Sequence, residues 1–126
     1  MKMLELNHVA IHVADVSRSA AFYRTALRLE LLPRPAFDFP GAWFRLGAAQ
    51  ELHLIGRSGP LAPTDGNNHF ALRVEDIAAW AAHLRQVGVE FNSQLRPDGA
   101  RQIFLSDPDG HFIELFTPQP PRRQAR

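Results

Sequence analysis

An internal repeat constrains the fold of this chain more than any other feature. The segment His-Val-Ala-Ile-His-Val-Ala-Asp at residues 8–15 is followed by His-Phe-Ala-Leu-Arg-Val-Glu-Asp at residues 69–76, an offset of 61 residues. The same offset relates His53 to Glu114, and each of these two residues lies between large apolar neighbours. Self-similarity at a fixed period indicates one supersecondary unit used more than once. Each copy therefore places one polar side chain on its first strand and another on its last.

The composition limits both the architecture and the chemistry. A chain of 126 residues fits one domain, and each half would be marginally stable alone. A formal net charge of +1 argues against nucleic acid or an anionic membrane as the main partner. The absence of cysteine excludes disulfides, thiolate metal sites and a cysteine nucleophile. Any metal must therefore be bound through nitrogen and oxygen. Because no signal peptide or transmembrane run is evident, we expect a cytoplasmic protein.

Apolar periodicity predicts a strand–helix–strand–strand–strand order in each half. Alternation at residues 6–13 is typical of a half-buried strand. Asp15 and Asp76 are suited to cap the helices that follow, and Gly88 is suited to end the second helix. Further strands are expected at residues 30–32, 42–46, 51–55, 90–95, 101–106 and 111–116.

These elements predict a single domain built from two modules. Module one spans about residues 4–56 and module two about residues 68–117. The linker at residues 57–67 is rich in glycine and proline, and the proline-rich basic tail at 118–126 is expected to be flexible. A long loop at 34–41 carries two aromatic residues that we expect to be exposed.

Strand alternation predicts that the four repeat-related residues lie on the sheet face opposite their apolar neighbours. Their apolar neighbours should be covered by the helices, so the polar side chains should project from the uncovered, concave side. Any one of them alone is more typical of an ordinary hydrogen-bonded residue, but their equivalent positions in a duplicated unit favour a metal site. Three imidazoles and one carboxylate suit Zn, Ni, Fe, Mn or Co. The predicted ligands are His8, His53, His69 and Glu114.

Other residues on the same faces suggest a substrate pocket. Trp43 and Phe104 occupy repeat-related positions and could form an apolar substrate wall or pack against a partner chain. Arg45 and Arg73 are further candidates for the pocket lining, and Glu51 is a candidate general base or second-choice ligand. His12 could line the pocket or lie at an exposed edge, whereas His83 and His111 are expected at the surface. No phosphate-binding loop or nucleophile motif is present in the sequence.

The sequence resembles the vicinal oxygen chelate superfamily over about residues 4–117. This superfamily includes glyoxalase I, methylmalonyl-CoA epimerase, extradiol dioxygenases and the fosfomycin and bleomycin resistance proteins. The resemblance is carried by Leu-Asn-His-Val-Ala-Ile at 6–11, Ser-Ala-Ala-Phe-Tyr at 19–23 and Asn-His-Phe-Ala-Leu at 68–72. Its most specific segment is Asp-Pro-Asp-Gly-His-Phe-Ile-Glu-Leu at 107–115.

The resemblance implies an α+β fold in which two tandem βαβββ modules form a curved mixed eight-stranded sheet with helices on the convex side. It implies a divalent metal held by His8, His53, His69 and Glu114, and a homodimer acting on a small molecule. The leading interpretation is a glyoxalase-type lyase or isomerase that acts on vicinal oxygens through a metal-chelated enediolate, with Glu114 or Glu51 transferring the proton.

The sequence leaves two alternatives open. In glyoxalase I, a carboxylate or an amide is the common metal ligand at the position that resembles His53. This chain therefore departs from the glyoxalase I ligand pattern. An Fe(II) extradiol-type dioxygenase would use His8, His69 and Glu114. A non-catalytic dimer of the bleomycin-resistance type would instead sequester a ligand or drug in an aromatic cleft. The fold alone does not decide among these functions.

Overall fold

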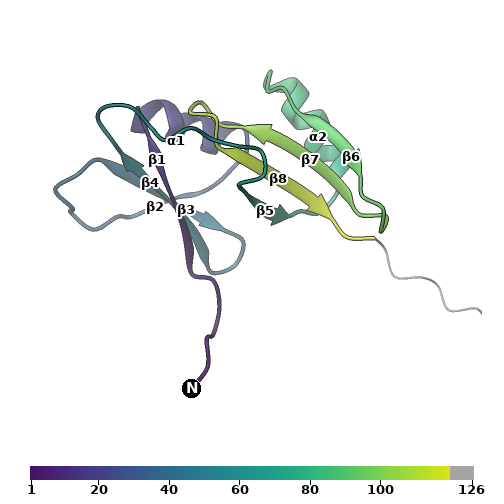
Figure 1. The fold of residues 1–126 in the computed structure, drawn as a ribbon, viewed down its shortest axis with the longest axis horizontal. Coiled ribbons are helices and arrows are strands. Elements are labelled where there is room, and N and C mark those ends of the chain that lie inside the picture. The colour runs from purple at the N-terminus through teal and green to yellow at the C-terminus, as the bar shows by residue number, and fades with distance from the viewer. Residues whose placement is uncertain (120–126) are drawn as a thin grey trace, which may run out of the picture. The chain divides into compact units, whose positions relative to one another are not determined.

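The computed structural model describes residues 1–119 and divides into two compact units (Figure 1). The first comprises Met1–Thr64 and Asp107–Gly110, and the second comprises Asp65–Ser106 and the described residues from His111. Most of the tail expected to be flexible, residues 120–126, lies outside the described residues. In the described part, neither helix has the length and apolar character that crossing a membrane would require.

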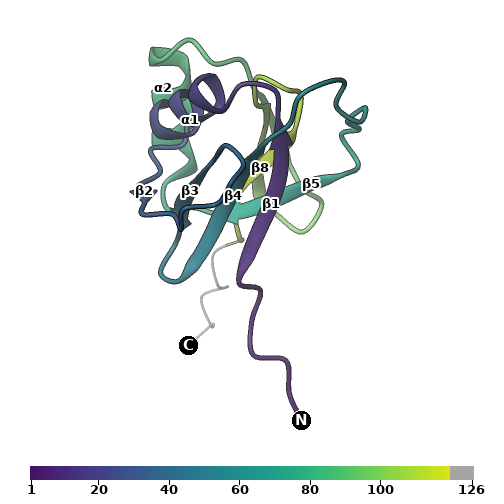
Figure 2. The ribbon, with the colours of Figure 1, turned by 90° about the vertical axis from the view of Figure 1, so that its left-hand side faces the viewer.

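The first unit is a four-stranded sheet with one helix on its apolar face (Figure 2). The strand order is β1-β4-β3-β2, in which β1 is parallel to β4 and the other pairs are antiparallel. Helix α1 packs against β3 and β4. The elements are β1 (His8–Val13), α1 (Val16–Thr25), β2 (Leu31–Leu32), β3 (Gly41–Leu46) and β4 (Gln50–Gly56).

The second unit has the same plan, with strand order β5-β8-β7-β6 and α2 packed on β7 and β8. The repeat also preserves register. His8 lies opposite Glu51 in the first unit, and their repeat partners His69 and Phe112 lie opposite each other in the second. The elements are β5 (His69–Arg73), α2 (Ile77–Gln86), β6 (Asn92–Leu95), β7 (Arg101–Ser106) and β8 (Phe112–Thr117).

Over residues 1–119, the predicted α+β class, the eight strands and the two helices are confirmed. The strands are hydrogen-bonded as two sheets of four, so the single eight-stranded sheet is divided into one sheet per unit. Several strand bounds also differ from the predicted ones. Strand β6 begins at Asn92 rather than residue 90 because its pairing with β7 starts there, and β8 extends to Thr117.

Local sequence signals explain where the helices begin and end. The Asp15 carboxylate accepts a hydrogen bond from the Arg18 amide at 3.1 Å, and Asp76 accepts one from the Ala79 amide at 3.1 Å. Both predicted N-caps are therefore confirmed. After α2, Gly88 has a φ of 74°, as expected of a residue that ends a helix. After α1, Arg28 has a φ of 55°, a left-handed conformation that a non-glycine residue rarely adopts.

The turn at residues 107–110 belongs to the first unit although it connects two strands of the second. The buried Tyr23 hydroxyl donates a hydrogen bond to Asp107 Oδ2 at 2.8 Å. Asp109 accepts hydrogen bonds from Arg18 at 3.1 Å and from the Ala14 amide at 3.2 Å. Burial, followed by the nearby carboxylate of Asp107, raises the pKa of Tyr23 far above its ordinary value. The most specific family segment therefore begins with residues that hold α1.

Candidate metal-binding faces

The second unit places His69 and Glu114 in direct contact on the face not covered by α2. His69 lies at the start of β5, and Glu114 lies on the neighbouring strand opposite Ala71. His69 Nε2 is 3.1 Å from Glu114 Oε1, while His69 Nδ1 is 3.1 Å from the carbonyl oxygen of Gly66. Gln102 Nε2 donates to the other Glu114 oxygen at 3.2 Å. Glu114 is 6% exposed, so its carboxylate is held almost entirely by protein groups.

The hydrogen-bond partners define the chemical character of this pair. A carbonyl oxygen can only accept, so the Nδ1 of His69 must carry the proton that it donates to Gly66. In a neutral imidazole, Nε2 then presents a lone pair toward the lone pairs of Glu114 Oε1. Two facing lone pairs require a shared proton or a cation between them. The residue pair therefore has the donor chemistry of two metal ligands.

The separation of the two donor atoms also fits a metal. Nitrogen and oxygen ligands lie roughly 2.0–2.1 Å from Zn, so two ligands at 90–109° are roughly 2.8–3.4 Å apart. The observed distance between His69 Nε2 and Glu114 Oε1 is 3.1 Å. The pair could bind a divalent cation with small side-chain movements, while Gly66 and Gln102 keep the two ligands oriented.

The first unit arranges its repeat-related residues differently. His53 stacks between two rings, with centroids 4.2 Å from His8 and 4.0 Å from Trp43. Its Nε2 atom is 2.8 Å from Glu51 Oε1, and the His53 side chain is 12% exposed. His8 Nδ1 is 2.8 Å from the side-chain oxygen of Asn7. This face therefore combines two imidazoles, a carboxylate and an indole.

The predicted metal-binding residues are thus found as two pairs, one in each unit. Within residues 1–119, no group of three or more His, Asp or Glu side chains is close enough together to hold a metal by itself. His8 and His53 share one sheet, and His69 and Glu114 share the other. The assignment of all four to one metal therefore remains a prediction.

The predicted pocket residues occupy different environments. Phe104 packs edge-on against His69 with ring centroids 5.7 Å apart, so it borders the second pair. Arg45 instead forms an ion pair with Glu30 at 3.5 Å and donates to the Ala48 carbonyl at 3.2 Å. Arg73 is exposed at the end of β5, four positions beyond His69 on the same face.

Sequence reasoning missed the residues that orient the candidate ligands. Gln102, Gly66 and Asn7 each contact one of them, but none was singled out by the repeat. The alternation of β7 could have identified Gln102, because it precedes Phe104 by two positions and therefore shares its face. Asn7 could have been found from the repeat, because Asn68 precedes His69 in the same way.

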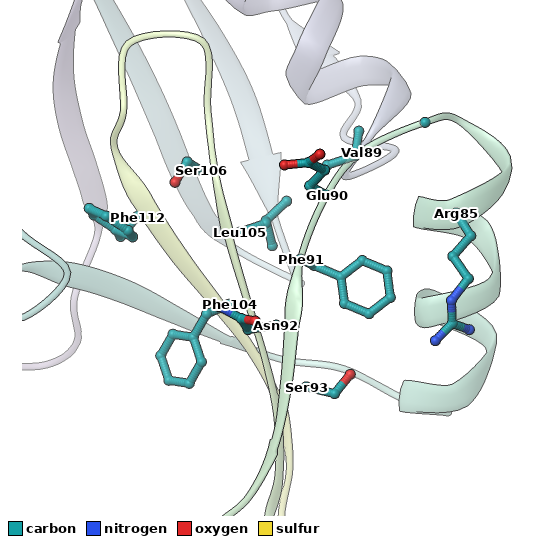
Figure 3. A pocket seen from close by; sticks show the side chains of 11 residues that line it. Arg85, Val89, Glu90, Phe91, Asn92, Ser93, Phe104, Leu105, Ser106 and Phe112 are labelled. Atoms are coloured by element: carbon teal, nitrogen blue, oxygen red, sulfur yellow. The ribbon is translucent and has the colours of Figure 1, made fainter.

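The second unit also contains an open pocket of about 1120 Å³ (Figure 3). Phe104 lines this pocket, whereas His69 and Glu114 do not. Figure 3 shows Phe104 and Phe91 pointing in opposite directions, with Arg85 beyond Phe91. The pocket therefore borders the candidate metal ligands through Phe104, which contacts His69, and through Phe112, which lies opposite His69 in the sheet. Its volume alone does not make it the centre of the chemistry.

Comparison with known proteins decides the family. Residues 5–115 match the sequence model of the glyoxalase/bleomycin resistance protein/dioxygenase superfamily. The chain belongs to this superfamily. The matched range covers both units and all four candidate ligands, so the resemblance inferred from the motifs is confirmed.

Relatives of known name within the glyoxalase superfamily have several activities. The chain is 31% identical to the metallothiol transferase FosB of Bacillus licheniformis, over 92% of this chain and 77% of the relative. It is 32% identical to the lactoylglutathione lyase of Salmonella typhimurium, over 90% of this chain and 92% of that enzyme. The crystal structure of a glyoxalase family protein from Bacillus anthracis superposes with a TM-score of 0.84 at 26% identity, over 94% of this chain and 98% of that one.

Proposed function

We propose that this chain is a metal-dependent lyase or isomerase of the glyoxalase type, acting on a small substrate with vicinal oxygens. Its metal ligands are His8, His53, His69 and Glu114, two from each unit. The observation that carries the proposal is the 3.1 Å approach of His69 Nε2 to Glu114 Oε1, with His69 Nδ1 already committed to a carbonyl oxygen. Membership of the superfamily and similarity to a lactoylglutathione lyase support the same reaction class.

The two carboxylates, Glu114 and Glu51, are suited to different roles, one as a metal ligand and the other as a general base. A bound divalent cation would polarise the substrate oxygens and acidify the neighbouring C–H. Glu114 Oε1 faces His69 Nε2, and Glu114 Oε2 accepts a hydrogen bond from Gln102, which favours a ligand role. The Glu51 side chain is 28% exposed and anchored through Oε1 by His53. Glu51 is therefore the better placed of the two carboxylates to take up a substrate proton.

Metal titration tests this proposal directly. Protein purified without added metal would be titrated with Ni, Zn, Co, Mn and, anaerobically, Fe(II). We expect one metal for each set of four ligands, and its loss on replacing His8, His69 or Glu114 with alanine. His83→Ala serves as the matched control because this histidine lies on α2, outside the set. Wild-type protein that binds none of these metals would refute the metal-dependent function.

One observation favours a second candidate, an Fe(II) extradiol-type dioxygenase. His53 is stacked on both Trp43 and His8 and is hydrogen-bonded to Glu51, so its ring is already engaged. Without His53, the ligand set would be His8, His69 and Glu114, the two-histidine, one-carboxylate combination of non-haem Fe(II) oxygenases. Oxygen uptake with a catechol and Fe(II), but no isomerase activity, would select this reaction. Ligand binding without metal or turnover would instead indicate a sequestering protein.

We also propose that the protein is a homodimer. Strands β1 and β2 are the edges of their sheet, and exposed edges are usually covered. Met1, Met3 and Leu4, just before β1, are more than nine-tenths exposed and so offer apolar surface to a second copy. Sedimentation at micromolar concentration should give the mass of two chains, and a monomer would contradict the proposal.

A further inference from the structure

The loop at residues 34–41, here called the aromatic loop, holds two exposed phenylalanines in fixed positions. Phe37 is 46% exposed and Phe39 is 39% exposed, and their rings stack with centroids 5.1 Å apart. The Arg34 guanidinium lies 4.9 Å from the Phe37 centroid and 4.8 Å from that of Phe39. It also donates a hydrogen bond to the Phe39 carbonyl at 2.9 Å. One cation therefore positions both rings.

Close packing against β3 and β4 fixes the loop further. A Cβ atom at Gly41 would lie 2.9 Å from Arg34 Nη2 and 2.5 Å from the Leu54 carbonyl oxygen, so only glycine fits there. A Cβ atom at Gly56 would lie 2.7 Å from the Pro40 side chain. The Gly56 amide also donates to the Pro40 carbonyl at 2.8 Å. The exposed rings therefore belong to a rigid part of the unit.

A continuous series of rings leads from this loop to the candidate metal ligands. Phe37 lies 6.1 Å from Trp43, Trp43 lies 4.0 Å from His53, and His53 lies 4.2 Å from His8. All of these rings belong to the first unit. A molecule bound through its oxygens near His8 and His53 would thus have Trp43 beside it, and the exposed Phe37 ring would come next in the series.

We infer that the aromatic loop binds a planar aromatic group of the substrate. The substrate class is then an aryl compound with two vicinal oxygens, such as an aryl α-keto acid or the thiol adduct of an aryl glyoxal. Exposed apolar side chains that are rigidly held are preorganised for binding, because a ligand that contacts them pays little entropy for ordering them. Continuity with His53 identifies that ligand as the substrate. The assignment of vicinal oxygens to the substrate rests on the proposed function, whereas the assignment of an aryl group rests on the aromatic loop alone.

Two matched probes test the inference. Phenylglyoxylate and pyruvate are both α-keto acids and differ only in a phenyl or a methyl group. The chain has two tryptophans, so a Trp80→Phe variant leaves Trp43, within the ring series, as the only indole fluorophore. Quenching of Trp43 would be titrated with both probes, with and without Zn. We expect phenylglyoxylate to bind about 10-fold more tightly than pyruvate, from contact with two additional rings.

Alanine variants then test whether the aromatic loop causes the preference for phenylglyoxylate over pyruvate. Phe37→Ala and Phe39→Ala should each lower the ratio of the two affinities roughly 2- to 10-fold, the contribution of one aromatic contact. Phe91→Ala is the control, because Arg85 lies 5.2 Å from the Phe91 ring in the second unit and the contact is of the same kind. That control should leave the ratio unchanged.

The outcomes separate this inference from the proposed function. If the protein binds no metal but still prefers phenylglyoxylate through Phe37 and Phe39, the inference stands and the proposed function fails. A ratio near one, or loop variants that behave like Phe91→Ala, overturns the inference even if metal binds. If the loop variants change the sedimentation mass and leave the ratio unaltered, the loop contacts a second copy of the chain and the inference is wrong.

Discussion

The two units offer the same backbone positions but different chemistry at them. In the second unit, His69 faces a carboxylate 3.1 Å away that is almost fully buried. In the first, the equivalent pair is two stacked imidazoles with ring centroids 4.2 Å apart. The registers of the strands that carry these residues are the same. Duplication has therefore fixed where the side chains lie, and single substitutions decide how they interact.

The position of the acidic residue also differs between β4 and β8, the last strand of each unit. The first unit has Glu51 followed by His53, whereas the second has Phe112 followed by Glu114. The carboxylate therefore lies two positions further along the strand in the second unit, a shift of about 7 Å. The Glu114 carboxylate contacts the His69 imidazole and accepts a hydrogen bond from Gln102, whereas the Glu51 carboxylate is partly exposed and contacts one imidazole. This difference is the basis for assigning a ligand role to one and proton transfer to the other.

The largest expected effect separates these two carboxylates. Glu114→Gln should weaken metal binding by about 100-fold or more, because it removes the anionic donor, and loss of orienting groups alone costs 10–100-fold. Glu51→Gln should leave metal affinity within about 10-fold of wild type and abolish most turnover. Isothermal titration with Zn and a steady-state assay would measure both. Equal losses of metal affinity in the two variants would remove the distinction.

A second experiment makes the first unit resemble the second. His53→Glu places a carboxylate where the repeat has Glu114, and we expect this variant to retain metal. It should preserve or raise isomerase activity on the hemithioacetal of methylglyoxal and glutathione. His53→Ala should weaken metal binding by roughly 10- to 100-fold. If His53→Ala binds Zn and Ni as tightly as wild type does, His53 is a pocket residue and the dioxygenase becomes the leading candidate.

The helices provide a third comparison, because the repeat relates Tyr23 to Leu84 and both are fully buried. Tyr23→Phe should destabilise the protein by about 1–3 kcal/mol, since Asp107 loses a buried donor. Denaturant unfolding would measure this loss. Leu84→Met, a volume-conserving change, is the matched control and should cost less than about 1.5 kcal/mol.

Alkaline titration adds a pH signature to the same variant. Because the pKa of Tyr23 is raised on folding, its contribution to stability is complete below about pH 10 and is lost as the pH rises above that value. Tyr23 is the only tyrosine, so tyrosinate absorbance should appear together with unfolding. Stability should fall less steeply above pH 10 in Tyr23→Phe. Tyrosinate absorbance in the folded protein near pH 10 would contradict this expectation.

The smallest effect concerns the ends of the two helices. Arg28 has a φ of 55° after α1, whereas a glycine has a φ of 74° after α2. Arg28→Gly should stabilise the protein by about 0.5–1 kcal/mol, and Gly88→Ala should destabilise it by about 1 kcal/mol. Opposite shifts in the urea midpoint would confirm the difference. Shifts in the same direction would show that the left-handed conformation is not responsible.

Sequence patterns predicted most of the fold because alternation, capping and the repeat are local signals. Asp15 and Asp76 could be recognised as caps, and the faces of Leu52 and Ile113 followed from period-two burial. The division into two sheets depends on pairing between distant strands, which no local pattern specifies. For the site, the repeat identified His69 and Glu114. It did not identify Gln102 or the carbonyl of Gly66, because orienting groups depend on three-dimensional proximity rather than on spacing.

The turn at residues 107–110 has a consequence for the order in which the protein can be completed during synthesis. During synthesis, residues 1–64 emerge from the ribosome before Asp107 and Asp109, which emerge only after β7 has been made. Until then, the Tyr23 hydroxyl and the Arg18 guanidinium lack the acceptors they have in the native state. The first unit therefore cannot reach its final packing before residues 107–110 have been made. A chain that stalls in the linker would leave α1 only partly fixed and accessible to chaperones and proteases.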